Sequence, residues 1–291
     1  CPDLVTDSSA QPVIAFDIAT LDLATDTCFI TYEVTVDNTV MPGESLQNSA
    51  VMDYDSQPVF VGGQTRRQMA ADTAEVTVLA PTLVKVDADS SLDDTGMAAG
   101  DPTLRDLTIG ETVTYELTLV FPEGVTGNAV LVDSLPDVME AIGAVVTATG
   151  GNLSTTLPGT PVFDDLQNGD GIDDTVTFDF GEVMNTPDGV DDANDRLTVQ
   201  IVARIVDVPA NVGGNVLVNN AQFTHDGGSL SDDADIEIVE PQTDLTKSMG
   251  PVTDGTVRIS LTIDNTGTAP AYDLSVEDVF DEADWDLSGF S

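Results

Sequence analysis

The sequence predicts an all-β fold of tandem Ig-like β-sandwich domains, one complete and two partial. Apolar and polar residues alternate with a period of two in segments such as 113–119, 175–180 and 257–263, as expected of half-buried strands. Clusters of Gly, Pro, Asn and Asp, which tolerate turn geometries, separate these segments. No long segment has the helical period of about 3.6 residues. Short strands joined by such turns are typical of β-sandwiches.

The strand pattern recurs along the chain and thereby divides it into domains. Residues 74–81 (AEVTVLAP) resemble residues 234–241 (ADIEIVEP), and a Leu-x-Lys segment follows each proline, at 83–85 and at 245–247. A further matching pair, 46–51 and 218–222, lies upstream of each proline. The recurrence predicts the C-terminal half of one domain at 1–80, a complete domain at 81–240, and the N-terminal half of a third at 241–291.

Acidic residues dominate the charge of the chain. It has 8 Lys and Arg residues against 52 Asp and Glu residues, for a formal net charge of −44, yet 41% of its residues are hydrophobic. No basic patch is available to neutralise nucleic acid phosphates or to bind an anionic membrane. The hydrophobic share excludes a disordered acidic tail, and no apolar run is long enough to insert into a membrane. This composition is typical of an extracellular, marine or halophilic surface protein.

Few residues are available for catalysis on an outside substrate. The chain has one His and two Cys, and it contains no catalytic triad, no carboxylate pair in a recognisable context and no cofactor motif. We therefore expect no enzyme, beyond a self-modification that occurs once. Cys1 and Cys28 could form one disulfide in an oxidising compartment, or remain two unlinked thiols.

The two lysines of the chain, Lys85 and Lys247, occupy the same position of the repeat. The alternation of side chains places Lys85 on the apolar face of its strand. The same argument places Asp133 with Leu131, and Asn219 with its apolar neighbours. A lysine, an aspartate and an asparagine are thus predicted to point into one sandwich core.

Three buried polar side chains are costly unless they satisfy one another. Apolar surroundings lower the pKa of a lysine and raise the pKa of an aspartate. A neutral amine beside a carboxamide is a nucleophile beside an electrophile, and a protonated acid can move protons between them. The arrangement predicts a Lys–Asn isopeptide bond. Unlinked polar residues in the core, or ion pairs at the surface, are the alternative.

Residues 113–119 (VTYELTL), 132–136 (VDSLP) and 217–221 (LVNNA) resemble the bacterial conserved repeat domain of cell-surface proteins. Residues 261–271 (LTIDNTGTAPA) resemble its TVTNTG-x-AP-A signature, and the early lysine adds a resemblance to fimbrial isopeptide-forming domains of Gram-positive pili and adhesins. The resemblance implies that Lys85 is the amine, Asn219 the amide and Asp133 the acid.

Other residues enter the same site by resemblance. Family members can use Glu as the acid, which keeps Glu116 as a second candidate, although its parity in the strand points to water. The equivalent positions in the partial domains are Lys247, Asp278 and Asn48. We expect Lys247 and Asn48 each to need a partner from outside this chain.

Acidic residues gather in three loops, at 87–94, 164–174 and 188–195. Calcium binds carboxylate oxygens on flexible loops that contain glycine. Residues 168–171 (NGDG) resemble the middle of an EF-hand loop, although the first Asp is out of register and no Glu closes the loop. The predicted calcium ligands are Asp164, Asp165, Asn168, Asp170, Asp173, Asp174, Asp191 and Asp195. A solvated acidic loop is the alternative.

Together these patterns predict a structural role. The chain would be a repeat segment of a large secreted or cell-surface protein, such as a fimbria, an adhesin stalk or a surface-layer or filament component, stiffened by calcium and isopeptide bonds. Its partners would be neighbouring repeats, and copies could also complement each other head to tail. A carbohydrate- or protein-binding adhesin module is the alternative, which an aromatic content of only 5% disfavours.

Overall fold

A computed structural model describes residues 5–7, 13–18, 21, 27–36, 40–55, 67–92, 95, 103–167, 169–281 and 284–286. The chain divides into two compact units, residues 1–40 and 41–291. In the first unit, β1 (Val5–Asp7) pairs antiparallel with β2 (Phe16–Ile18). The described residues contain no α-helix, and none of them forms a helix able to span a membrane; their one helical turn is the 3-10 turn η1 (Ala193–Asp195).

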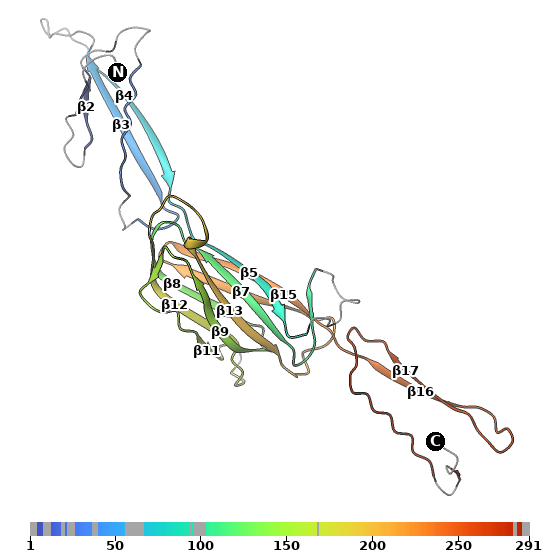
Figure 1. Ribbon diagram of the computed structural model, residues 1–291. Helices are drawn as coiled ribbons and strands as arrows, with labels where there is room; N and C mark the ends of the chain where they lie inside the picture. Colours follow the sequence, from blue (N-terminus) through green and yellow to red (C-terminus); the bar gives the residue numbers. More distant parts are fainter. Residues whose placement is uncertain are drawn as a thin grey trace, which may run out of the picture. The chain divides into compact units, whose positions relative to one another are not determined.

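Two sheets form a β-sandwich in the second unit (Figure 1). The smaller sheet has the order β5–β7–β13–β9, made of Thr82–Ser90, Thr112–Val120, Arg196–Ile205 and Met139–Thr149. The larger sheet has the order β10–β12–β8–β14–β15–β6, made of Leu153–Thr155, Thr175–Asn185, Gly124–Ser134, Val216–His225, Gly228–Ile238 and Arg105–Leu107. The short strand β11 (Val162–Asp164) also pairs with β12. The predicted all-β sandwich fold is confirmed.

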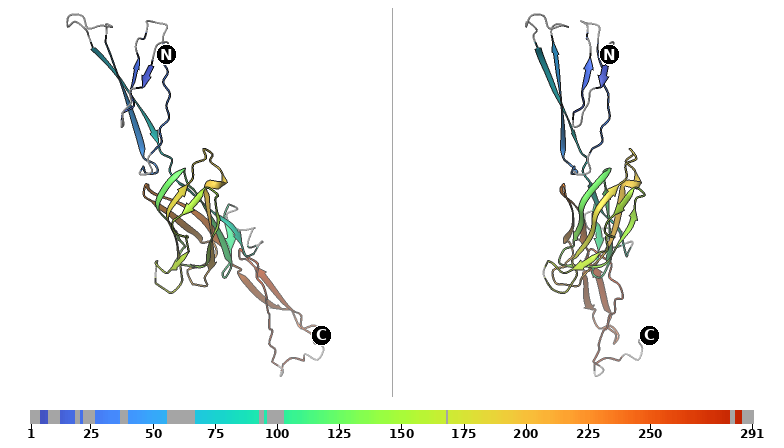
Figure 2. Two further views of the ribbon diagram at one scale, coloured as in Figure 1. Left: turned by 60° about the vertical axis from the view of Figure 1, so that its left-hand side comes forward. Right: turned by 90° about the vertical axis from the view of Figure 1, so that its left-hand side faces the viewer.

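Two antiparallel hairpins belong to the same unit and form two-stranded sheets of their own (Figure 2). One pairs β3 (Ser45–Asp55) with β4 (Arg67–Thr77), and the other pairs β16 (Thr243–Met249) with β17 (Ile259–Asn265). Every strand of the sandwich lies between Thr82 and Ile238. The domain boundaries expected at 80/81 and 240/241 stay a prediction.

The alternation of side chains builds the sandwich core. Along β7, every second residue from Val113 to Leu119 is buried, and the residues between them are partly exposed. The strands facing them supply Leu131 from β8 and Phe223 from β14, both 0% exposed. Side chains of both sheets thus meet in one apolar cluster. Burial of this apolar surface is the main stabilising contribution to the fold.

The larger sheet ends in short strands. At one edge, β6 pairs in parallel with the last three residues of β15, Ile236–Ile238. Toward the other edge, β10 and β11 each have three residues and both pair with β12. The long strands β8 and β14 therefore lie inside the sheet, whereas β15 is paired with β6 only at its last three residues and β12 is paired with the short strands only at its two ends.

Candidate functional site

Lys85 enters the core from the edge strand of the smaller sheet. Its strand, β5, alternates buried and exposed residues, with Leu83 and Lys85 on the inner face. Lys85 pairs with Leu117 of β7, which is 0% exposed. The Lys85 side chain is itself 0% exposed, so its amine lies in apolar surroundings.

Asp133 meets Lys85 across the sandwich. It lies in β8 of the larger sheet, and its Oδ2 is 2.5 Å from Lys85 Nζ, with both side chains 0% exposed. Burial lowers the pKa of Lys85 and raises the pKa of Asp133, in each case against the opposing effect of the partner's charge. Burial therefore shifts both groups toward their neutral forms.

Asn219 completes the group from β14. Its neighbour Ala221 pairs with Asp133, so Asn219 lies one diagonal step away on the same face of the sheet. Asn219 is 0% exposed. Its amide acts on the pKa of Asp133, in the lowering direction, but less strongly than burial raises it. Among the described residues, neither Nδ2 nor Oδ1 of Asn219 has a hydrogen-bond partner of normal geometry.

Two further residues contact Lys85, and the sequence analysis had not assigned them to the site. The amine of Lys85 lies 5.0 Å from the centre of the Tyr115 ring, which covers it from β7. The main-chain nitrogen of Lys85 donates a hydrogen bond to Asp232 Oδ2 at 2.7 Å. The inward parity of Tyr115 could have identified it, whereas Asp232 has no local signal in its acidic segment.

Glu116, the second candidate acid, is not part of this group. It lies on the other face of β7, where it accepts a hydrogen bond from Gln200 Nε2 at 3.2 Å. Because neighbouring residues of a strand point to opposite faces, Glu116 points away from the core that holds Lys85.

The equivalent residues of the partial domains form half of a similar arrangement. Lys247 Nζ lies 2.5 Å from Asp278 Oδ1, and their side chains are 36% and 23% exposed. Lys247 also lies 5.3 Å from the centre of the Phe280 ring. Asn48 is exposed on β3. The lysine and the acid are thus together here, and the asparagine lies on another hairpin.

Hydrogen bonds from main-chain nitrogens to two carboxylates hold the acidic loop at 164–174 in place. Asp165 accepts hydrogen bonds from the main-chain nitrogens of Gly169 and Gly171, at 2.8 and 2.6 Å. The buried Asp174 accepts from the nitrogens of Leu166 and Gln167, at 3.1 and 3.2 Å. These carboxylates therefore close the turn as hydrogen-bond acceptors.

A contact between residues only two apart in sequence recurs in the acidic loops. Asp170, Asp188 and Asp192 each accept a hydrogen bond from the main-chain nitrogen two residues further along, as does Asp179 within β12. The Asp side chain has the right length for this Asx turn. Turn formation thus gives a physical reason for so many Asp residues in the loops.

The described residues contain no group of three His, Cys, Asp or Glu side chains arranged to hold a metal ion. Asp164 lies in β11, and Asp173 is exposed beside the buried Asp174. Asn168, at the centre of the predicted calcium loop, lies outside the described residues. Calcium binding stays a prediction.

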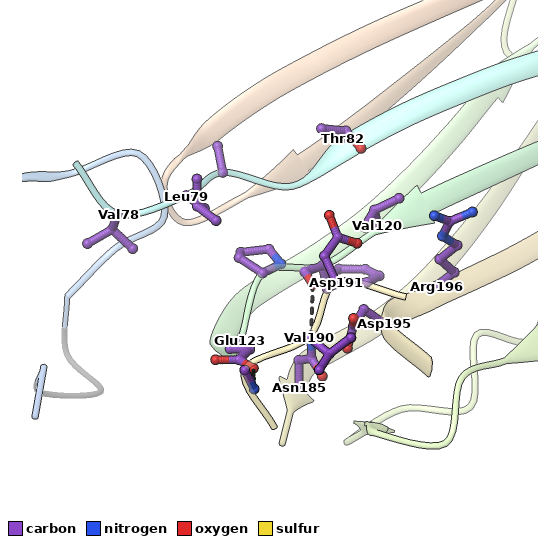
Figure 3. A pocket seen from close by; sticks show the side chains of 14 residues that line it. Val78, Leu79, Thr82, Val120, Glu123, Asn185, Val190, Asp191, Asp195 and Arg196 are labelled. Carbon is purple, nitrogen blue, oxygen red and sulfur yellow. Dashed lines mark hydrogen bonds between the residues drawn. The ribbon is translucent and has the colours of Figure 1, made fainter. Parts of the chain in front are cut away.

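Asp191 and Asp195 line a cavity of about 640 Å³, together with residues 78–80, 82 and 120–123 (Figure 3). Asp195 accepts a hydrogen bond from the Asp192 nitrogen at 2.9 Å, which lowers the pKa of Asp195 and caps η1. Asn185 Nδ2 donates to the main-chain oxygen of Phe121 at 2.9 Å. These polar groups are engaged in holding the loop that follows β12.

Of the two cysteines that the sequence predicts to pair, the structure describes only Cys28. Cys28 is disulfide-bonded. Cys1 lies outside the described residues.

No family model matches the chain, and no curated protein matches it. Part of the chain is similar in structure to a fragment of the major pilin GBS80 of Streptococcus agalactiae, with a TM-score of 0.35, 12% identity, and coverage of 57% of this chain and 58% of that one. The C-terminal domain of the AgI/II polypeptide BspA of the same species is similar with a TM-score of 0.35 and 13% identity, over 62% of this chain and 60% of that one. The major pilin subunit BcpA of Bacillus cereus is similar with a TM-score of 0.31 and 11% identity, over 70% of this chain and 66% of that one.

In all three comparisons the chain covers less than two thirds of the similar structure. At TM-scores this low, the likeness supports no conclusion about what this chain does. The function has to be argued from its own residues.

Proposed function

We propose that the chain is a structural segment of a cell-surface protein, with its sandwich closed by an isopeptide bond between Lys85 and Asn219. The observation that carries this is the buried group itself: Lys85 Nζ is 2.5 Å from Asp133 Oδ2, and Asn219 is buried on the adjacent strand. Burial of an ion pair costs several kcal/mol per ion, by an order-of-magnitude estimate. An amide between Lys85 and Asn219 would remove the buried amine and leave the acid free to stay neutral.

The reaction starts from the neutral amine and neutral acid that burial favours. Lys85 Nζ attacks Cγ of Asn219, while the protonated Asp133 donates a hydrogen bond to Oδ1. The Nζ–Cγ bond forms, the Cγ–Nδ2 bond breaks, and Asp133 carries a proton from Nζ to the leaving nitrogen. The products are a secondary amide and one molecule of ammonia, so no oxidant, reductant or cofactor is consumed.

The Tyr115 ring shields the reacting side chains from water. Its ring covers the Lys85 amine from β7 and is 0% exposed. Exclusion of water keeps the charged forms of Lys85 and Asp133 unfavourable. It also keeps water from competing with the amine for the Asn219 carbonyl carbon.

The bond would join the first strand of the sandwich, β5, to its next-to-last strand, β14. The loop that it closes, from Lys85 to Asn219, has about 135 residues. In the chain-entropy description of cross-links, closing a loop of this length stabilises a fold by about 5 kcal/mol. A pulling force would then pass through a covalent bond instead of the hydrogen bonds between strands, which suits a stalk or fimbrial subunit.

The acidic exterior supports the same role. A formal net charge of −44 keeps a protein soluble and discourages non-specific association. Neighbouring domains of the same kind are the partners that a stalk segment would contact, outside the cell. Calcium in the Asp-rich loops would stiffen it further, although the hydrogen bonds described above already close those turns without a cation.

Intact mass spectrometry of the denatured and reduced chain tests the bond. We expect a mass lower than the sequence mass by one ammonia molecule, and full sequence masses for the variants Lys85→Ala and Asn219→Ala. Reduction keeps the disulfide at Cys28 out of the comparison. A wild-type chain at its full sequence mass contradicts the bond.

The identity of the acid is tested by two matched variants. Asp133→Asn removes the group that moves the proton, and we expect the ammonia loss to disappear. Glu116→Gln changes a carboxylate on the other face of β7, and we expect the ammonia loss to be complete. The opposite pattern would assign the acid to Glu116.

A further inference from the structure

Two short linkers join the sandwich to the hairpins that precede and follow it in the chain. The first linker, residues 78–81, leads from β4 to β5, and the second linker, residues 239–242, leads from β15 to β16. Each contains the proline of the recurring sequence, Pro81 or Pro241. Segments that join compact parts of a chain allow relative motion unless contacts hold them. The contacts of each linker therefore decide whether its junction bends.

The two linkers start from the same hydrogen-bonded arrangement. Gly43 N donates to the main-chain oxygen of Val78 at 3.0 Å, just before the first linker. Gly214 N donates to the main-chain oxygen of Ile238 at 2.7 Å, just before the second linker. The junctions are thus built alike up to this point and can be compared position by position.

The segment that follows β17 holds the second linker. This segment, residues 265–269 (NTGTA), is part of the signature found in the sequence. Thr266 N donates to the main-chain oxygen of Gln242 at 2.7 Å. Thr268 N donates to the main-chain oxygen of Glu240 at 2.8 Å, and Glu240 N donates in return to Thr268 Oγ1 at 3.1 Å. Residues 265–269 therefore form a clamp on the linker main chain.

Two further residues of the clamp bring the segments together. Asn265 Oδ1 accepts a hydrogen bond from Gln242 N at 3.1 Å, and Asn265 Nδ2 donates to the main-chain oxygen of Ala269 at 2.8 Å. A side chain on Gly267 would overlap main-chain atoms of residues 240–242. Glycine therefore permits the close approach on which the clamp depends.

The second linker is also tied to the sandwich that precedes it. Glu240 Oε2 accepts a hydrogen bond from Gly213 N, in the loop between β13 and β14, at 2.8 Å. Val239 is 0% exposed, and its nitrogen donates to the main-chain oxygen of Leu107 at 2.9 Å. Hydrogen bonds thus run from the clamp, through the linker, to the sandwich.

The first linker lacks the tie through a carboxylate. Because Val78 matches Ile238 and Gly43 matches Gly214, Ala80 stands in place of Glu240 and Pro42 in place of Gly213. Alanine has no carboxylate to accept the hydrogen bond, and proline has no N–H to donate it. The sequence has therefore removed this contact from both sides.

The clamp is missing at the first linker as well. Ile263 of β17 and Leu119 of β7 each pair with the leucine of a Leu-x-Lys segment, so residues 121–125 (FPEGV) correspond to the clamp. In the part of the chain that the structure describes, no hydrogen bond joins residues 121–125 to the first linker. The main-chain oxygen of Pro42 lies close to Gly227 of the sandwich, without a hydrogen bond between the described groups.

A carboxylate and a cavity occupy the place of the clamp at the first linker. Glu123 stands where the clamp has Gly267, and it accepts a hydrogen bond from Asp188 N at 2.8 Å, in the loop that follows β12. The cavity of about 640 Å³ is lined by residues 78–80 on one part and 120–123 on another (Figure 3). The first linker therefore has space beside it where the second linker has bonded main chain.

We propose that the two junctions differ in stiffness: the second linker is a rigid joint held by the clamp, and the first linker is a hinge. Main-chain groups bonded on both sides of a linker resist rotation, whereas a segment with few such bonds opens at low cost in free energy. The chain would then bend between β4 and β5 and transmit force and torque between β15 and β16. This difference does not depend on the isopeptide bond, which lies inside the sandwich.

Double electron–electron resonance between spin labels on the full chain tests the difference. One label is placed by Gln222→Cys on β14, and the other by Thr262→Cys on β17 or by Thr73→Cys on β4, all exposed positions. Labelling without reductant leaves the disulfide at Cys28 intact. We expect the distance distribution across the second linker to be about half as wide as that across the first. Both outer labels lie on two-stranded hairpins, so fraying of a hairpin affects both. Equal widths overturn the proposal.

Variants of the clamp test its cause. Thr268→Val with Asn265→Ala removes side-chain bonds of the clamp, and Glu240→Ala removes the tie to the sandwich without changing the hairpin. We expect each to widen the distribution across the second linker toward that across the first. Thr246→Val, an exposed change on β16, is the matched control and should leave the width unchanged. A width that neither clamp variant changes would assign the stiffness to something other than these residues and overturn the clamp.

Amide hydrogen exchange separates a released clamp from an unfolded hairpin. In the clamp variants, the amides of Gln242 and Thr266 should exchange about ten-fold faster, while amides within β16–β17 keep their wild-type rates. If the double variant also speeds exchange within β16–β17, the result for Glu240→Ala decides. An unchanged width in Glu240→Ala would then contradict the rigid joint.

Discussion

The main-chain nitrogen of Lys85 donates a hydrogen bond to Asp232 Oδ2 across 2.7 Å, although 147 residues separate the two in sequence. Lys85 lies in the smaller sheet and Asp232 in the larger one. This contact therefore joins the two sheets beside the point where the lysine amine enters the core. It fixes the position of β5 along β15, and with it the position of Nζ against Asp133.

Replacement of Asp232 should weaken the fold and slow the isopeptide reaction. Without the acceptor, the half-buried nitrogen of Lys85 loses its partner, and we expect Asp232→Ala to lower the free energy of unfolding by about 1–3 kcal/mol. Urea unfolding in an Asn219→Ala background, which cannot form the bond, measures this. Asp233→Ala is the matched control, because Asp233 is exposed on the same strand. Equal effects of the two substitutions would contradict a specific role of Asp232.

Removal of one partner from the buried pair should cost far more than removal of one from a surface pair. Asp133→Ala leaves the Lys85 amine buried without its acid, and we expect a loss of about 3–5 kcal/mol relative to Asn219→Ala. Glu140→Ala breaks the pair with Arg204, whose side chains are 31% and 47% exposed, and should cost about 0–1 kcal/mol. The double variant Lys85→Met with Asp133→Ala should recover most of the loss. If the double variant recovered no stability, the loss in Asp133→Ala would come from packing and not from the unpaired charge.

The buried pair should make stability depend on pH at both ends of the scale. Burial raises the pKa of Asp133 above its ordinary 3.8, so its contribution to stability is present below that pH and is lost as the pH rises through the folded-state pKa. Burial lowers the pKa of Lys85 below its ordinary 10.5, so its contribution is present above that pH and is lost as the pH falls through the folded-state pKa.

Urea midpoints of two unbonded variants measure this pH dependence. We expect Asn219→Ala to be least stable between those two pH values, relative to the same variant with Lys85→Met and Asp133→Leu, and to gain on it toward both extremes. A difference that favours the charged pair most at neutral pH would show that the pair is ionised in the fold.

Calcium should raise the melting temperature if the loop at 164–174 binds it. Scanning calorimetry in millimolar calcium, with EDTA and magnesium as comparisons, measures the shift. Asp170→Ala should abolish the shift, and Asp207→Ala, an exposed acid outside the predicted ligand set, should retain it. No shift with calcium would leave the Asx-turn hydrogen bonds as the reason for the acidic loops.

The sequence was enough to predict which side chains of the site are buried, but not all of the contacts that they make. A period of two places Lys85, Asp133 and Asn219 on inner faces, because adjacent side chains of a strand point in opposite directions, and all three are buried. The hydrogen bond to Asp232 could not be predicted, because it depends on how two sheets pack and no local pattern encodes that. The parallel pairing of β6 was missed for the same reason.

The acidic loops were ambiguous for a different reason. Calcium sites and Asx turns both use Asp with Gly on short loops, so composition alone does not separate them. The structure adds the main-chain donors of these loops and does not test calcium binding. Asp165 and Asp174 receive main-chain N–H groups, which the sequence could not assign to particular carboxylates.

The short edge strands of the larger sheet have a consequence for crowded surroundings. A long exposed strand edge is a template for further strands and hence for aggregation, whereas three-residue strands such as β6 and β10 offer little to extend. The smaller sheet ends instead in the longer strands β5 and β9, so this protection is limited to parts of the larger sheet. The eleven-residue strands β3 and β4 are paired only with each other within the described residues and lack this protection. Any strand addition would thus be directed to the smaller sheet and to the β3–β4 hairpin, and away from the short edge strands of the larger sheet.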